Sequence, residues 1–338
     1  MKSLADVARL AGVSKATASR ALSGTGYVSE RTRLLVTQAA LDLGYVASTN
    51  AASLVTGRTR NIGVVSPYIN RWFFAEVIDG VEEALLEDGY DLTLYRLRGD
   101  ADQRARVFDY FLVRKRVDAV IAVGMDFASD DVGPLFSLRK PVVGVGSQLP
   151  GATTVGIDDI AASRLITRHL IDLGHRRILH LGGPIDGTAT AVHSRRREGF
   201  RLEMASAGLS EGADVAPCEM TTAEAYTAVL EFLERAETLP TAIAAASDEV
   251  AVGAILAART RGLTVPEDLS VIAIDDHPLS ALFDLTTVAQ APSKQGRAAA
   301  RLVLGILAGA TPTAPGLIAA PLEITYRGST AAPSSTSR

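Results

Sequence analysis

The stretch LADVARLAGVSKATASRAL, residues 4–22, decides the fold of the N-terminal part of this 338-residue chain. Its first apolar side chains recur at the i, i+3, i+4 and i+7 spacing of one helix face, at Leu4, Val7, Ala8 and Ala11. Gly12 then ends the first helix, and Ser14 stands where the N-cap of a second helix is expected. Two short helices around a glycine turn predict a helix-turn-helix.

The second helix is expected to turn small apolar residues toward the first and to leave a polar face exposed. The residues turned inward are Ala18, Ala21 and Leu22, and those left exposed are Lys15, Ala16, Thr17, Ser19 and Arg20. Small, hydroxyl-bearing and basic side chains contact base edges and phosphates in a DNA major groove. The alternative is an ordinary helical hairpin with a solvated polar face, and the pattern favours DNA binding.

The distribution of charge supports DNA binding by this part of the chain. Residues 1–60 hold eight Lys and Arg but only three Asp and Glu, although the whole chain has 34 basic and 38 acidic residues. A basic head on an acidic body is typical of a phosphate-binding module joined to domains that do not bind nucleic acid.

A third helix and a linker are expected after the helix-turn-helix. Ser29 is placed to cap a helix over residues 29–43, with an inward face made of Leu35, Val36, Ala39, Ala40 and Leu43. Residues 47–60 are small and polar, apart from Leu54 and Val55. Their composition favours a flexible linker over a short helix that forms only on binding.

The composition of the chain and the motifs that it lacks exclude several classes of protein. A single cysteine, Cys218, excludes an intrachain disulfide and a cysteine-based metal site. The scattered histidines lack metal-ligand spacing, and no phosphate-binding loop or nucleophile elbow occurs, so we expect no enzyme, no cofactor and no metal. No signal peptide opens the chain, and no apolar run approaches the about 18–20 residues of a membrane span. We therefore expect a cytoplasmic protein without membrane contact.

From residue 61 onward, apolar strands alternate with amphipathic helices, which predicts parallel sheets covered on both faces. Strands are expected at 62–66, 91–97, 118–124, 141–146, 177–183, 242–247 and 270–275. Helices are expected at 74–88, 101–115, 160–173, 195–207, 222–235, 249–262 and 292–308. A break near 153–159, followed by a new βα series, predicts two similar lobes with a cleft between them.

Ligands of such sheets lie beyond the carboxyl ends of the strands. This rule selects as candidate ligand-contacting loops the segments 66–74, 124–130, 182–196, 247–249 and 275–278.

The series of motifs resembles the LacI/GalR family of bacterial transcription regulators over about residues 3–327. The most specific resemblance is in the head, in DVARLAGVSKATASRAL (6–22), VSERTR (28–33) and LDLGY (41–45). Further similar motifs are NIGVV (61–65), FFAEVIDGVEEALLEDGYDL (73–92), GIDD (156–159), HLIDLGHRRILHLGG (169–183), REGF (197–200), SDEVAVGAI (247–255), SVIAIDD (270–276) and LTTVAQ (285–290).

The resemblance implies an α/β protein with a three-helix head, a hinge helix and a two-lobed core like that of periplasmic binding proteins. The implied parts are the helix-turn-helix head at 1–46, the hinge or linker at 47–60 and the core at 61–330. Lobe 1 is expected at about 61–158 and 289–316, lobe 2 at about 159–288 and 317–330, and a disordered tail at 331–338. Such proteins act as homodimers on a palindromic operator.

In the head, the resemblance assigns base contacts to Lys15, Ala16 and Arg20, and phosphate contacts to Ser14, Thr17, Ser19 and Arg31. Leu54 falls on the leucine that family members insert into the minor groove, where an apolar wedge bends the duplex. The chain departs from the usual hinge at Ala47, Ser48, Ala51 and Ala52, so an arginine that often contacts the minor groove is missing. Ala18 replaces a usual valine, which we expect to loosen the core of the head.

In the core, the resemblance assigns effector contacts to Arg196, Ser247 and Asp275. Further candidates are Trp72, Phe73 and Phe74 in a first-lobe loop and Asp126 after a later strand. Aromatic faces combined with Arg and Asp are typical of a sugar site. The alternatives are that Phe73 and Phe74 are core residues and that the arginine run 195–197 is a solvated face.

The expected function is repression of carbohydrate-metabolism genes, relieved by a small sugar-like effector. One alternative is a solute-binding protein, but the basic head and the missing signal peptide argue against it. Another is a corepressor-dependent regulator that senses a non-sugar metabolite.

Overall fold

The computed structural model describes residues 2–24, 26–45, 58–97, 106, 117–125, 132–137, 139–185 and 190–334. The chain forms two compact units, one containing Met1–Asn61 with Arg116–Asp118 and the other containing Ile62–Lys115 with Ala119–Arg338. Most of the expected linker and nearly all of the helix expected at 101–115 lie outside the described residues.

The described residues of the head form three helices, α1 (Leu4–Leu10), α2 (Lys15–Ser23) and α3 (Glu30–Leu43). A serine precedes each helix and accepts a hydrogen bond from a backbone N–H of the first turn, which satisfies a donor that the helix itself leaves unpaired. Gly24 and Gly44 follow α2 and α3 in the left-handed conformation that glycine adopts without a steric penalty. The predicted helix-turn-helix is confirmed.

The core of the head is made of small side chains: Val7, Ala8, Ala18, Ala21, Val36, Ala39 and Ala40. The prediction that Leu35 faces inward is wrong, because this side chain is 51% exposed. Successive helix residues are rotated by about 100°. The face that Val36, Ala39 and Ala40 share therefore leaves Leu35 on its solvent side.

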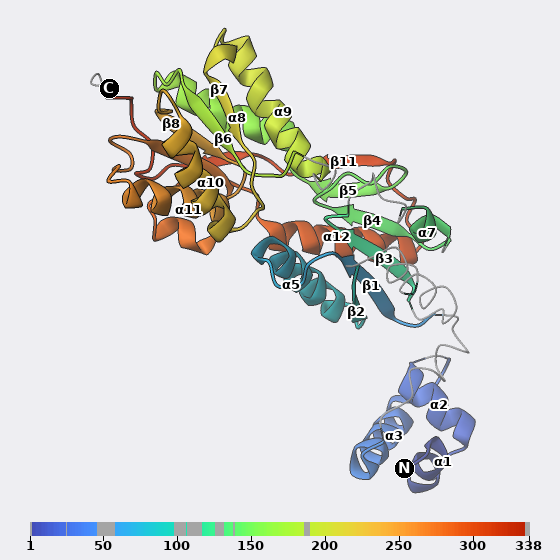
Figure 1. The fold of residues 1–338 in the computed structure, drawn as a ribbon. Coiled ribbons are helices and arrows are strands. Elements are labelled where there is room, and N and C mark those ends of the chain that lie inside the picture. Colours follow the sequence, from blue (N-terminus) through green and yellow to red (C-terminus); the bar gives the residue numbers. More distant parts are fainter. Residues whose placement is uncertain are drawn as a thin grey trace. The chain divides into compact units, whose positions relative to one another are not determined.

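The second unit contains two six-stranded sheets, each in its own lobe (Figure 1). The first sheet has the order β11-β5-β4-β3-β1-β2, with β1 (Asn61–Ser66), β2 (Asp91–Arg96), β3 (Ala119–Val123), β4 (Val142–Val145), β5 (Thr153–Gly156) and β11 (Gly316–Ala319). The second has the order β12-β10-β9-β8-β6-β7, with β6 (Ile178–Leu181), β7 (Ala213–Ala216), β8 (Ala242–Ala245), β9 (Ser270–Asp275), β10 (Thr286–Ala289) and β12 (Glu323–Thr325). β12 is antiparallel to β10, whereas β9, β8 and β7 lie parallel to their neighbours.

Helices cover the sheets as the alternating pattern predicts. In the first lobe, α5 (Trp72–Glu87) packs on α12 (Pro292–Leu307), and both contribute to the core around β1 and β3. In the second lobe, α8 (Asp159–Asp172) and α9 (Ala191–Ser206) form one core with the sheet, and α10 (Thr222–Arg235) and α11 (Asp248–Thr260) form another. The short elements are α7 (Val132–Ser137), η1 (Ser210–Gly212) and η2 (Pro278–Ala281). No helix in the described ranges has the length and hydropathy needed to cross a bilayer.

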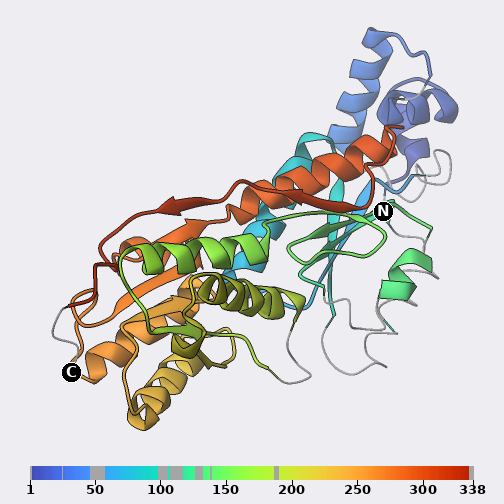
Figure 2. The same ribbon diagram turned by 90° about the horizontal axis from the view of Figure 1, so that it is seen from above.

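The chain passes between the lobes after β5, after β10 and after β11; Figure 2 shows the first crossing in green and the other two in orange and red. The last crossing follows Ala319, because β11 pairs in parallel with β5 of the first sheet. The boundary was expected at about residue 316, because a short exposed strand has no apolar run to mark its end.

The C-terminal segment is held to the second lobe beyond the point where a tail was expected. His175 Nε2 donates to the carbonyl oxygen of Ala331 at 2.9 Å, and Ser270 Oγ donates to the same oxygen at 3.0 Å. The backbone N–H of Ala331 in turn donates to Ser270 Oγ at 3.0 Å. Small polar composition suggested disorder from residue 331, but the backbone at Ala331 is paired, and residues 335–338 lie outside the described part of the chain.

Candidate functional site

The polar face of α2 is accessible, as expected for a surface that contacts DNA. Lys15, Ala16, Ser19 and Arg20 are exposed and Thr17 is half-buried. Ser14 Oγ accepts a hydrogen bond from the Thr17 N–H at 3.0 Å and lies 2.8 Å from Thr17 Oγ1. These two hydroxyls therefore stabilise the start of the helix besides facing solvent.

Basic side chains flank this face. The Arg20 Nε donates to the carbonyl oxygen of Ala16 at 3.4 Å, which keeps the arginine stem along the helix. Arg31 is exposed in the first turn of α3. Leu54, the expected minor-groove residue, lies outside the described residues.

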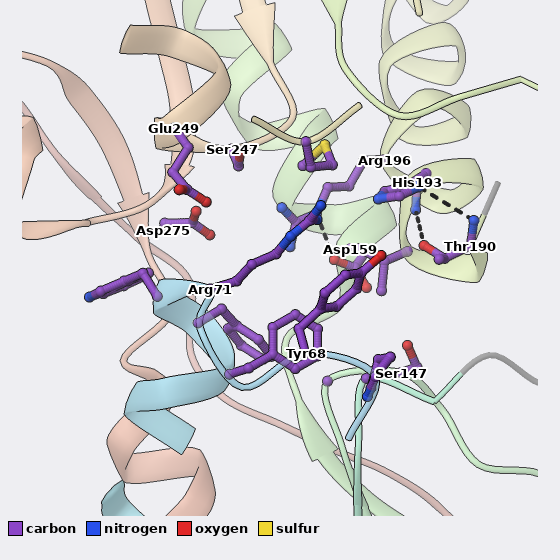
Figure 3. Close-up of a pocket in the computed structure, with 18 of the residues that line it drawn as sticks. Tyr68, Arg71, Ser147, Asp159, Thr190, His193, Arg196, Ser247, Glu249 and Asp275 are labelled. Carbon is purple, nitrogen blue, oxygen red and sulfur yellow. Dashed lines mark hydrogen bonds and ion pairs between the residues drawn. The ribbon is translucent and has the colours of Figure 1, made fainter. Parts of the chain in front are cut away.

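The second unit contains a cavity of about 360 Å³ where the carboxyl ends of strands from both sheets meet. Six of the seven residues expected to contact an effector line it: Trp72, Phe73, Phe74, Arg196, Ser247 and Asp275. The seventh, Asp126, lies outside the described residues. Figure 3 shows Asp275, Glu249 and Ser247 on one side of the cavity and Thr190 and His193 on the other, with Arg71 extending between them.

The first-lobe wall of the cavity is mainly aromatic. The Phe74 ring packs edge-on against Tyr68 at 5.2 Å and against Phe73 at 5.4 Å between ring centroids. Gly124 has φ +57°, and a Cβ there would lie 2.5 Å from Phe74 Cε1, so the ring occupies space that only glycine leaves free. Trp72 contacts the His277 ring of the second lobe at 4.7 Å between centroids.

The second-lobe wall is built on a buried ion pair. Arg196 is only 5% exposed, and its Nε donates to Asp159 Oδ1 at 2.9 Å while its Nη1 donates to the carbonyl oxygen of Ala246. Burial raises the pKa of the Asp159 carboxyl, although the Arg196 charge opposes this shift. The alternative that Arg196 belongs to a solvated arginine face is wrong.

Two further buried carboxyls, those of Asp275 and Asp248, lie near the ion pair of Arg196 and Asp159. Asp275 accepts a hydrogen bond from Gln290 Nε2, and Asp248 accepts bonds from the His277 N–H at 2.8 Å and from the hydroxyls of Ser280 and Thr287 at 2.5 Å each. Burial, and next the charge of Asp248, raise the pKa of Asp275 well above its usual value. Burial likewise raises the pKa of Asp248.

His193 supplies a neutral polar group to the cavity. Burial, followed by the charges of Arg196 and Arg71, lowers the pKa of His193 to about 4. Its Nδ1 accepts a hydrogen bond from the Thr190 N–H at 3.3 Å, and this geometry assigns the ring proton to Nε2. A neutral imidazole with a donor at Nε2 is suited to a ligand oxygen.

Sequence reasoning missed several lining residues, among them Tyr68, Arg71, Asp159, His193 and Gln290. The signals were present, because Asp159 ends the GIDD motif, Gln290 ends LTTVAQ, and the other three lie in loops that were expected to contact a ligand. Their chemistry was not assigned, because no motif marks it: His193 pairs with nearby Thr190, whereas Asp159 pairs with Arg196, 37 residues away.

Two family models match the chain. Residues 3–48 match the model described as bacterial regulatory proteins, lacI family, and residues 167–330 match a periplasmic binding protein-like domain.

Curated relatives match most of the chain. The HTH-type transcriptional repressor PurR of Haemophilus influenzae is 33% identical over 309 residues, which cover 90% of this chain and 90% of the relative. The repressor of the same name from Vibrio cholerae is 33% identical over 311 residues, covering 90% and 91%.

Solved structures show the same fold. A transcriptional regulator CelR-cellobiose complex is 29% identical with a TM-score of 0.71, covering 97% of this chain and all of that one. A lac repressor dimer bound to operator and the anti-inducer ONPF is 23% identical with a TM-score of 0.87, covering 98% and 99%.

Proposed function

Because the chain belongs to the lacI family of bacterial regulatory proteins, which are DNA-binding repressors and not enzymes, we propose that a sugar-like effector bound in the cavity controls the affinity of the chain for a palindromic operator. The observation that carries this proposal is the cavity itself, where Arg196, Asp275 and an aromatic wall line one space of about 360 Å³. The regulated genes in this proposal are those of carbohydrate metabolism.

The chemistry of the cavity favours a polyhydroxylated ligand. Asp275 and Arg196 supply an acceptor and a donor for charge-assisted hydrogen bonds to hydroxyl groups. Phe73 and Phe74 supply apolar surface for the C–H face of a ring. The volume fits a monosaccharide or similar small molecule, because ligand sites of about 300–1,000 Å³ hold small ligands. The CelR-cellobiose complex also supports a sugar.

A purine-related effector is the second candidate. The curated repressors that cover 90% of the chain carry the name PurR. A flat heterocycle would stack on the aromatic wall, and Asp275 would accept a ring N–H.

The head is proposed to bind the operator as part of a homodimer. Lys15, Ala16 and Arg20 contact bases in this proposal, whereas the phosphate contacts come from Ser14, Thr17, Ser19 and Arg31. Leu54 is proposed to enter the minor groove. A DNA-binding repressor acts where the chromosome lies, so the proposed location is the cytoplasm.

A thermal-shift screen of the full chain against sugars, sugar phosphates, nucleosides and purines tests the effector site. A ligand at about 100 times its Kd adds about 2.7 kcal/mol to stability. We expect a sugar to raise Tm, and Asp275→Asn to weaken its binding about 10- to 100-fold, because the variant keeps the shape but replaces an acceptor oxygen with an NH2 group. A purine hit with the same sensitivity favours the second candidate. A hit unaffected by Asp275→Asn contradicts the proposed site.

A further inference from the structure

Arg71 brings a cation to the aromatic wall of the cavity. It stands immediately before α5, is half-buried, and places its guanidinium carbon 4.0 Å from the centroid of the Tyr68 ring. A guanidinium held over an aromatic face loses little freedom when it binds a further group. Figure 3 shows the side chain extending from the start of α5 into the cavity toward Arg196.

The two arginines of the cavity differ in their charge partners. Arg196 is neutralised by Asp159 at 2.9 Å. Arg71 forms no ion pair with any carboxylate in the described part of the chain. Both charges lower the pKa of His193, so both lie close to the same neutral ring. Among the described residues that line the cavity, Arg196 is therefore a cation with a carboxylate partner, and Arg71 is a cation without one.

The remaining charges favour a ligand with a single negative charge. Glu219, Glu249 and Asp275 all line the cavity from the second lobe. A dianionic phosphate would be repelled by these carboxylates, whereas one carboxylate matches the planar fork of a guanidinium. The same acidic wall accepts hydrogen bonds from hydroxyl groups.

We propose that the effector is a monoanionic sugar acid, with its carboxylate on Arg71 and its hydroxyl groups toward Asp275 and Arg196. This inference rests on the proposed sugar-like effector and narrows it to one chemical class. Neither Arg71 nor an acidic effector follows from the family resemblance, which assigns the ligand contacts to Arg196, Ser247 and Asp275.

Isothermal titration of the full chain with matched sugars tests the inference. The probes are D-glucuronate, D-galacturonate and D-gluconate, their neutral counterparts D-glucose and D-galactose, and glucose 6-phosphate. The variants are Arg71→Gln, which removes the charge, and Arg71→Lys, which keeps the charge but loses the fork. Arg176→Gln is the matched control, because Arg176 is exposed in the second lobe and does not line the cavity.

We expect a sugar acid to bind at least tenfold more tightly than its neutral counterpart. Arg71→Gln is expected to weaken that binding about 10- to 100-fold, the range for a charge-assisted hydrogen bond, and to abolish the preference for the acid. Arg71→Lys should lie between, and Arg176→Gln should match the unmodified chain. Glu249→Gln should not weaken binding of the acid, because it removes a carboxylate that repels an anion from the cavity.

Three results would overturn the inference. If neutral sugars bind as tightly as the acids and Arg71→Gln loses no affinity, the inference of a sugar acid is wrong. The sugar-binding cavity still stands in that case, provided that Asp275→Asn weakens the binding. A preference for glucose 6-phosphate over every sugar acid refutes the carboxylate. If none of the probes binds, the result contradicts the proposed sugar effector as well.

Discussion

The head and the cavity use charged side chains in opposite ways. In the head, Lys15, Arg20 and Arg31 are exposed on a scaffold of small alanine and valine side chains. In the cavity, Arg196 and Asp275 are buried and hydrogen-bonded within the second lobe. Exposed cations attract a polyanion over a distance and are screened by salt, whereas buried groups hold fixed positions and are expensive to leave unpaired.

This difference separates two kinds of recognition in one chain. Charges on the head contribute little to folding and so are free to serve affinity for DNA. Charges in the cavity are part of the folded core, so the same substitution changes both stability and the binding of a small ligand.

The largest expected effect is that of Arg196→Ala. The substitution leaves Asp159 buried without its cationic partner, and breaking such a pair costs about 3–5 kcal/mol. Urea unfolding monitored by circular dichroism measures the loss. Arg201→Ala is the control, because Arg201 is exposed on the same helix and should cost no more than about 0.5 kcal/mol. Equal losses for the two variants would show that the cavity charges are not part of the core.

Gly124→Ala tests the aromatic wall. The new Cβ would meet the Phe74 ring, and the backbone there has φ +57°. Gly208→Ala is the matched control, since Gly208 has φ +71° with nothing within 4 Å of the added Cβ. The control measures the strain of the left-handed backbone alone, about 1–2 kcal/mol. We expect Gly124→Ala to lower the free energy of unfolding by about 1–3 kcal/mol more than Gly208→Ala does, as for an overpacked core, and to weaken effector binding. If both variants lose the same stability, Phe74 is not fixed at the cavity.

The pH dependence of stability tests the buried carboxyls. Because the pKa of Asp275 is raised on folding, the native state binds more protons than the unfolded state above about pH 4, so stability falls as pH rises toward the native pKa. Asp275→Asn removes this titrating group and its charge repulsion with Asp248. The free energy of unfolding should therefore decrease less steeply with pH in the variant than in the unmodified chain, by up to about 1.4 kcal/mol per pH unit. Tm values from pH 5 to 8 measure it, with exposed Asp214→Asn as control. Identical curves for Asp275→Asn and the unmodified chain would contradict the raised pKa.

The smallest expected effect is that of Arg31→Gln in the head. One lost phosphate contact should reduce the slope of log K against log salt concentration by about 1, while stability stays within about 0.5 kcal/mol. Fluorescence anisotropy with a DNA duplex at several salt concentrations measures the slope, and Arg176→Gln should leave it unchanged. A slope unaffected by Arg31→Gln places this arginine off the DNA.

The sequence predicted those elements whose pattern is local. The runs at 62–66 and 242–247 are continuous and apolar, and both became central strands. β10 was missed because Thr286 and Thr287 interrupt the apolar pattern, yet both are fully buried with their hydroxyls hydrogen-bonded to distant partners. The exposure of Leu35 was missed for a similar reason, because the face of α3 that becomes buried depends on how the helices pack together.

In the cavity, the sequence indicated which loops meet but not which side chains neutralise each other. Arg196 was selected by its spacing to Gly199, where a Cβ would clash with the backbone of Ile160. Its partner Asp159 lies 37 residues away, and no local pattern relates the two. Among the described residues, Arg71 has no carboxylate partner, and no local pattern in the sequence marks this difference from Arg196.

We propose that one part of the chain binds DNA and another binds the effector that controls this binding. The most direct test of this proposal is the anisotropy of a duplex selected from a random library by the full chain, titrated with the effector found in the panel. Allosteric coupling of about 1–3 kcal/mol predicts that effector changes DNA affinity about 5- to 150-fold. Asp275→Asn should retain the DNA affinity of the unmodified chain but require at least tenfold more effector for the same change. An unaltered effector response in Asp275→Asn, or an equal loss of DNA affinity and effector response, would contradict the account.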